Sequence, residues 1–104
     1  MKLLFITCLQ DFKDEITQLM KQAGVSVYSI AEMTGIRNGS SGNMLDDWFG
    51  VQDGLYNSLM IFSFTTEEAA YRAMKHISAY NDSTESKFPV RVFIMPVEAT
   101  NYSN

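Results

Sequence analysis

Residues 25–64 read VSVYSIAEMTGIRNGSSGNMLDDWFGVQDGLYNSLMIFSF, and this stretch decides the fold. It begins and ends with apolar runs, residues 25–33 and 55–64, which we interpret as two strands of a hairpin, the first with a bulge near Ser29. Between them lies a polar, glycine-rich segment, residues 35–54, without periodicity of its own. A loop of this length is usually functional or disordered. We favour a functional loop, and a disordered insertion without a role is the alternative.

The segment before the hairpin predicts a strand and a helix. Residues 3–8 form a short apolar run that is typical of a central strand buried on both faces. Residues 11–23 carry apolar side chains at helical spacing, and Asp11 is the expected N-cap of that helix. Gly24 stands where a helix C-terminus needs a left-handed residue. This part therefore predicts a strand, a helix and a sharp turn into the hairpin.

The segment after the hairpin predicts a second helix and a last strand. Thr65 and Glu68 fit a capping box at the start of a helix that runs to about residue 80. Residues 81–87 are polar and predict a turn. Residues 88–95 predict a strand, which the following proline ends.

The order of elements predicts an α+β fold, the ferredoxin-like βαββαβ sandwich. Its antiparallel sheet would carry two helices on one face, with the long loop between strands 2 and 3. The other face would take one set of apolar side chains from each of residues 3–6, 59–64 and 90–95. An apolar face of that size is rarely left in water, so we expect an oligomer that packs sheet on sheet. Residues 1–104 would form a single domain.

Composition narrows the class of protein. The net charge is −4 and the basic residues are scattered, which argues against binding to nucleic acid or anionic membranes. No segment approaches the roughly 20 apolar residues of a membrane span, and no signal peptide precedes the first strand. One cysteine excludes an internal disulfide. We expect a cytoplasmic protein.

The sequence offers no persuasive catalytic constellation, so we do not expect an enzyme; a small ferredoxin-like enzyme is an alternative without a visible acid–base pair. Cys8 ends a strand and is expected to be an inert buried thiol, and His76 is expected to be a solvated helix residue. As metal ligands, these two with methionines would suit copper(I). Asp46, Asp47 and Asp53 could form a divalent-cation site, although a solvated loop is the default interpretation.

The long loop carries apolar side chains near its middle. Met44, Leu45, Trp48 and Phe49 interrupt an otherwise polar segment. Large apolar side chains on a loop are suited to burial against another protein, because aromatic anchors often dominate the binding energy of interfaces. We therefore expect these four residues to bind a protein partner.

Four stretches together give the chain a family resemblance. They are MKLLFI, FKDEITQLMKQAGV, VYSIAEMTGIRNG and VFIMPVE, in that order from residue 1 to about residue 99. In this order, and with the long loop after the third stretch, the chain resembles the PII signal-transduction family, the nitrogen regulatory proteins P-II of the PII and CutA-like superfamily. The insertion at about residues 36–54 is similar to the flexible T-loop of that family.

The resemblance implies a regulatory trimer. Family members bind adenine nucleotides in clefts between subunits and move the T-loop to control partners such as transporters, enzymes or regulators. The related CutA-like trimers imply metal binding or metal tolerance as an alternative. The residues that the resemblance places in the effector cleft are Ser29, Gly35, Arg37, Asn38, Phe62, Phe64 and Arg91. Arg91 falls near the family's phosphate-binding lysine.

The chain also departs from the family pattern. The stretch NDSTESKFPVR replaces a glycine-rich phosphate loop and contains no glycine, and the tail ATNYSN contains no basic residue. Val51 and Gln52 occupy the region of the tyrosine that is modified in classical members, and the nearest tyrosine is Tyr56. Because phosphate contacts are normally charge-assisted, these departures argue against tight triphosphate binding and for an altered or lost ligand.

Overall fold

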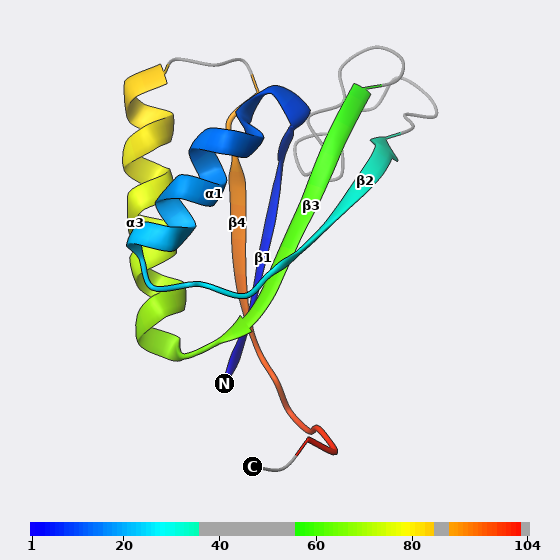
Figure 1. Cartoon of the computed structure of the whole chain (residues 1–104), viewed down its shortest axis with the longest axis vertical. Helices are drawn as coiled ribbons and strands as arrows, with labels where there is room; N and C mark the ends of the chain where they lie inside the picture. The colour runs from blue at the N-terminus through cyan, green and yellow to red at the C-terminus, as the bar shows by residue number, and fades with distance from the viewer. Residues whose placement is uncertain (36–55, 85–87, 103–104) are drawn as a thin grey trace, which may run out of the picture.

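The computed structural model describes residues 1–35, 56–84 and 88–102. Its elements in chain order are β1 (Lys2–Leu9), the short 3-10 turn η1 (Gln10–Phe12), α1 (Lys13–Gln22), β2 (Ser29–Gly35), β3 (Tyr56–Thr65), α3 (Glu67–Thr84) and β4 (Arg91–Pro96). The strands form one antiparallel sheet in the order β2-β3-β1-β4. Figure 1 shows both helices on one side of it. The predicted ferredoxin-like arrangement is confirmed.

The core lies between the helices and one face of the sheet. The largest fully buried side chains come from both layers: Leu4, Ile6, Ile16, Met20, Val25, Ile61 and Ile77. Strand β3 shows the alternation that a half-buried strand requires, because Leu59, Ile61 and Ser63 are buried whereas Phe64 on the other face is 58% exposed. One set of apolar side chains from this strand therefore lies on the face away from the helices, as the sequence predicts.

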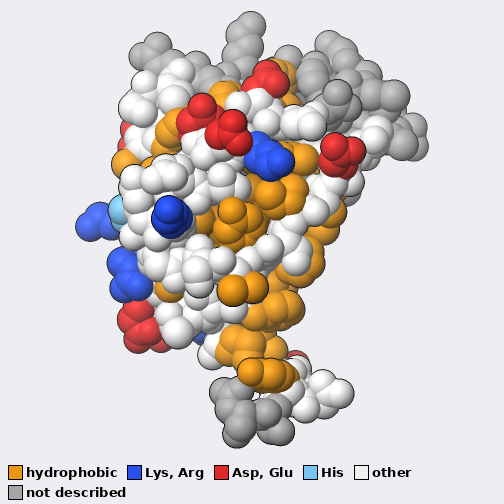
Figure 2. Space-filling view, in the orientation of Figure 1, with side chains coloured by type: hydrophobic (Ala, Val, Ile, Leu, Met, Phe, Trp, Pro, Cys, Tyr) orange, Lys and Arg blue, Asp and Glu red, His pale blue; other side chains and the backbone are white. Residues whose placement is uncertain are grey.

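The other face of the sheet is apolar. Phe5 lies directly opposite both Phe62 and Phe93, and its ring meets that of Phe93 edge to face at a centroid distance of 6.4 Å. Leu3 lies opposite Phe64 in the same way. In Figure 2, hydrophobic side chains gather along the strand side of the molecule, away from the helices. Within the described residues no helix packs against this open face, as the sequence predicts.

The strand predicted over residues 25–33 is wrong in its first half. β2 begins only at Ser29 and then pairs with β3 in continuous register, without the expected bulge. Val27 is 80% exposed, and its carbonyl accepts a hydrogen bond of 2.6 Å from the Ser63 hydroxyl. Residues 25–28 are therefore a connector that the Ser63 side chain links to β3. The alternation of apolar and polar residues in this connector does not reflect pairing with another strand.

The start of the first helix also differs from the prediction. Asp11 lies inside the 3-10 turn η1 and is not the N-cap. Phe12 takes the N-cap position of α1, without a side-chain capping bond. Residues 10–12 form a separate 3-10 turn, and the α-helix begins only after it, at Lys13. The expectation for the other end is confirmed, since Gly24 has a φ of +91°.

The second helix begins one residue later than predicted. Thr65 is the last residue of β3 and pairs with Lys2, so it cannot cap α3. Thr66 is the cap instead: its hydroxyl accepts a hydrogen bond of 3.2 Å from the Ala69 amide. The predicted capping box with Glu68 is therefore wrong by one position.

The same helix ends later than predicted, at Thr84 and not near residue 80. The Asn81 side chain donates to the Val90 carbonyl at 2.8 Å and accepts from the Val90 amide at 2.9 Å. The Ser83 hydroxyl donates to the Tyr80 carbonyl. Residues 81–84, which were predicted to lie in a turn, are therefore helical, and β4 starts at Arg91 rather than at residue 88. No helix in the described part of the chain has the length and apolar character of a membrane span.

Candidate functional site

The long insertion leaves the sheet between β2 and β3. Gly35, the last residue of β2, lies opposite Tyr56, the first residue of β3. Residues 36–55 lie outside the described part of the chain. The sequence-predicted site residues that fall there are Arg37, Asn38, Met44, Leu45, Asp46, Asp47, Trp48, Phe49 and Asp53. Their assignment stays a prediction.

The remaining predicted effector residues are spread along the sheet. Ser29 lies opposite Phe62, whereas Gly35 lies opposite Tyr56 at the end from which the insertion leaves. Phe64 lies near the far end of β3. Phe64 lies eight positions after Tyr56, and at about 3.4 Å per residue this corresponds to roughly 27 Å. One chain therefore does not bring Gly35 and Phe64 together.

Two smaller groupings do form within one chain. The rings of Phe62 and Phe64 meet edge to face, with their centroids 6.5 Å apart. Arg91 starts β4 and lies opposite Thr7 on β1. Because Phe62 and Arg91 both lie on the open face, that face offers aromatic side chains together with one positive charge, which is a combination suited to a nucleotide base and its phosphate.

A small polar pocket of about 260 Å³ lies where the insertion leaves the sheet. It is lined by Gln10, Glu32, Met33, Thr34 and Ser58. This pocket could not be predicted from the sequence, because its residues come from η1, β2 and β3 and meet only through the sheet register. The Glu32 carboxylate disfavours an anion here and favours ligand groups that donate hydrogen bonds.

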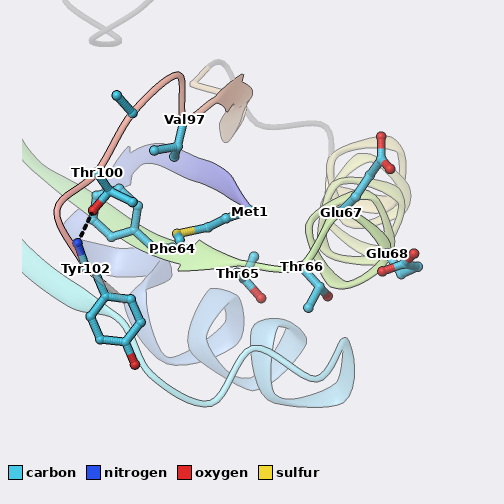
Figure 3. A pocket seen from close by; sticks show the side chains of 10 residues that line it. Met1, Phe64, Thr65, Thr66, Glu67, Glu68, Val97, Thr100 and Tyr102 are labelled. Carbon is cyan, nitrogen blue, oxygen red and sulfur yellow. Dashed lines mark hydrogen bonds between the residues drawn. The ribbon is translucent and has the colours of Figure 1, made fainter. Parts of the chain in front are cut away.

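A larger cleft of about 1070 Å³ lies at the opposite end of the molecule (Figure 3). It is lined by Met1, by residues 64–68 at the end of β3 and the start of α3, and by Val97, Ala99, Thr100 and Tyr102 of the C-terminal segment. Phe64 is the one predicted effector residue among its lining residues. This cleft, which we call the tail cleft, was not predicted from the sequence.

Two of the predicted metal candidates, Cys8 and His76, lie in the described part of the chain. Cys8 is 5% exposed, and burial raises its pKa from the ordinary value of 9.0 to about 11. A neutral thiol is a poor metal ligand, because the thiolate is the form that binds. His76 lies on α3. Among the described residues, no group of three or more His, Cys, Asp and Glu side chains is arranged to hold a metal ion.

Comparisons with known proteins agree on one family. The family model of nitrogen regulatory protein P-II matches residues 1–103. CPII from Thiomonas intermedia K12, a nitrogen regulatory PII-like protein solved with ADP, AMP and bicarbonate bound, has 21% identity and a TM-score of 0.66, covering 98% of this chain and 94% of that one.

A putative PII-like signaling protein from Thermus thermophilus has 20% identity and a TM-score of 0.60, covering 89% of this chain and 82% of that one. No curated protein matches the sequence. At these identities the structural likeness establishes a shared fold.

Proposed function

The chain belongs to the nitrogen regulatory protein P-II family, and we propose that it is a PII-like signalling protein that senses a small effector. The observation that carries the proposal is the family match over residues 1–103, nearly the whole chain. Members of this signalling family are generally not enzymes, and we expect no catalytic activity. The effector we propose is an adenine nucleotide or a related molecule.

We place the effector in clefts between subunits. Proteins of this family are typically homotrimers. The open apolar face supports self-association of this chain, because such a surface is costly to leave in water. The separation of Gly35 from Phe64 supports a site made by two chains. One subunit would contribute Gly35 and the start of the insertion, and its neighbour would contribute Ser29, Phe62 and Phe64.

The charges of the chain favour a nucleotide with few phosphates. CPII is solved with ADP and AMP together with bicarbonate or acetate. In this chain Arg91 is the cation that we assign to a phosphate, and the tail brings no basic side chain to help it. Each phosphate contact is strengthened when its donor is charged. We therefore propose ADP or AMP as the effector class, in preference to ATP.

The insertion would transmit the signal. In this proposal the effector changes the conformation of residues 36–54, a common switching device, and that segment docks on a protein partner such as a membrane transporter. Met44, Leu45, Trp48 and Phe49 would be the anchors. Trp48→Ala should then abolish partner binding while folding and self-association remain intact. Unfolding of that variant would instead make Trp48 a core residue.

The first test is a thermal-shift titration with ADP, AMP and ATP, each with and without bicarbonate. A ligand that binds only the native state stabilises it by about 2.7 kcal/mol at one hundred times its Kd. We expect ADP or AMP to raise the melting temperature more than ATP does. Arg91→Gln should remove that shift, and Lys75→Gln, an exposed substitution on α3, should retain it.

Two outcomes would count against this function. No shift with any nucleotide would remove the effector proposal. A shift with copper, zinc or cobalt salts alone would favour metal binding, with the ligands in a part of the chain outside the described residues.

A further inference from the structure

The small polar pocket lies at the neck of the long insertion, and we call it the neck pocket. Its described lining residues come from three segments: Gln10 from η1, residues 32–34 from the second half of β2, and Ser58 from the start of β3. Figure 1 shows that β1 ends, β2 ends and β3 begins at the same end of the sheet. A ligand in the neck pocket would therefore touch both strands from which the insertion leaves.

The sheet register places the neck pocket on the helix side of the sheet. Glu32 lies opposite Leu59, whose side chain is buried in the core between the sheet and the helices. Because successive residues of a strand point to opposite faces, Thr34 shares this face with Glu32. Met33 and Ser58 lie opposite each other between them and point to the other face, so they offer their backbone to the pocket. The neck pocket is thus separate from the aromatic open face.

The charges around the neck pocket favour a cation. Glu32 carries the one charge among the described lining residues. The adjoining residues 11–15 contain three acids and one base. Two of these acids, Asp14 and Glu15, lie in the first turn of α1, where they offset the positive end of the helix dipole. A positive ligand group beside the Glu32 carboxylate is attracted, whereas a negative group is repelled.

The ligand groups of the neck pocket suit an organic cation better than a metal ion. Calcium and magnesium take about six or more oxygen ligands, and the described lining residues include a single carboxylate. Gln10 and Thr34 add neutral oxygen atoms, which accept hydrogen bonds from N–H groups. The volume of about 260 Å³ corresponds to roughly eight or nine water molecules of liquid. A molecule of the size of a short diamine fits this volume.

We propose that the neck pocket binds a small organic cation that carries a primary ammonium or a guanidinium group. The Glu32 carboxylate balances the charge of the cation, and Gln10 and Thr34 accept further hydrogen bonds from it. Because the ligand contacts β2 and β3 where the insertion begins, its binding stabilises this end of the hairpin. The site requires neither a nucleotide nor a second chain, so the inference goes beyond the proposed function.

The test is a titration of the whole protein with putrescine and with agmatine, followed by two-dimensional amide NMR. Putrescine carries ammonium groups alone, and agmatine carries one ammonium and one guanidinium group, so their affinities distinguish the two head groups. Butanediol has nearly the size of putrescine without its charge, and potassium chloride matches the ionic strength. We expect an amine to shift the amide signals of residues 10, 32–34 and 58, and we expect no such shift with the diol or the salt.

Substitutions test the role of each ligand group. Glu32→Gln removes the charge at nearly constant size and should weaken amine binding about tenfold, since a hydrogen bond to a charged group is lost. Thr34→Val keeps the shape of the side chain without its hydroxyl and should weaken binding about threefold. Glu68→Gln is the matched control, because it removes an exposed carboxylate that lines the tail cleft, and it should keep wild-type affinity. Far-UV circular dichroism checks the folding of each variant.

Three outcomes would overturn the proposal. If neither amine shifts the signals of the lining residues, the neck pocket does not bind such cations. If Glu68→Gln weakens binding as much as Glu32→Gln does, the amines respond to the net charge of the protein and not to this site. If butanediol shifts the same signals, the pocket does not select a cation. A protein that binds amines but gives no thermal shift with nucleotides would lose the proposed effector and retain the neck pocket.

Discussion

The double hydrogen bond of Asn81 should be one of the strongest polar contributions to the stability of this domain. Asn81→Ala removes both bonds to Val90, one of 2.8 Å and one of 2.9 Å. Val90 is 3% exposed, so water has little access to its backbone groups. An unsatisfied buried group costs about 1–3 kcal/mol. Because both bonds are only partly buried, we take the lower half of that range for each and expect a total loss of about 2–4 kcal/mol.

The measurement is urea unfolding followed by far-UV circular dichroism at one protein concentration. With an m-value of about 2 kcal/mol per molar urea, which is typical of a small domain, the midpoint should fall by roughly 1–2 M. Ser83→Ala is the matched control, because Ser83 lies at the same helix end and its exposed hydroxyl donates to the Tyr80 carbonyl. That variant should stay within about 0.5 kcal/mol of wild type. Equal midpoints for the two variants would refute the reasoning.

Two further predictions concern a turn and a buried thiol. Gly24→Ala should cost about 1–2 kcal/mol, because Gly24 has a φ of +91° and a Cβ there would lie 3.3 Å from Arg72 Nη2; unchanged urea stability would contradict this backbone geometry. The pKa of Cys8 rises on folding from 9.0 to about 11, so the unfolded chain loses this proton first. Stability should be complete below pH 9 and fall between pH 9 and pH 11 by up to roughly 2–3 kcal/mol. Cys8→Ala should show a shallower fall over that range, since Tyr80, whose pKa is also raised by burial, is present in both proteins. Equal slopes would show that the thiol does not carry the effect.

Local periodicity was sufficient to predict most of the sheet. In β3 the alternation of Leu59 and Ile61 with Met60 and Phe62 follows directly from the two faces of a strand. Gly24 was predictable for a similar reason, since a left-handed residue after a helix strongly favours glycine. Both features depend on residues that are close together in the sequence, so the sequence alone is sufficient to predict them.

The errors arose where distant residues decide the local structure. Residues 25–28 alternate like a strand, but the Ser63 hydroxyl holds the Val27 carbonyl from 36 positions away. Polar residues after position 80 suggested a turn, but the bonds of Asn81 to Val90 extend the helix. Neither contact leaves a pattern within a short window of sequence.

The candidate sites were predictable only in part. The resemblance named residues such as Gly35 and Phe64, yet their separation depends on the sheet register, which residue identity does not give. The tail cleft was not foreseen because its lining residues come from the N-terminus, the start of α3 and the C-terminal segment. Tyr102 and Phe64 are both large and apolar, which was the available signal. The sequence does not show that the two residues line the same cleft.

The position of β1 in the sheet has a consequence for the synthesis of the chain. β1 is an inner strand, paired on one side with β3 and on the other with β4. The ribosome makes β1 long before either partner, so this apolar strand waits without a sheet until most of the domain has emerged. Pairing of strands so distant in sequence is slow, and exposed strands are prone to aggregate. Nascent chains that stop before β3 should therefore be bound by chaperones, and the domain should fold only after β4 has emerged.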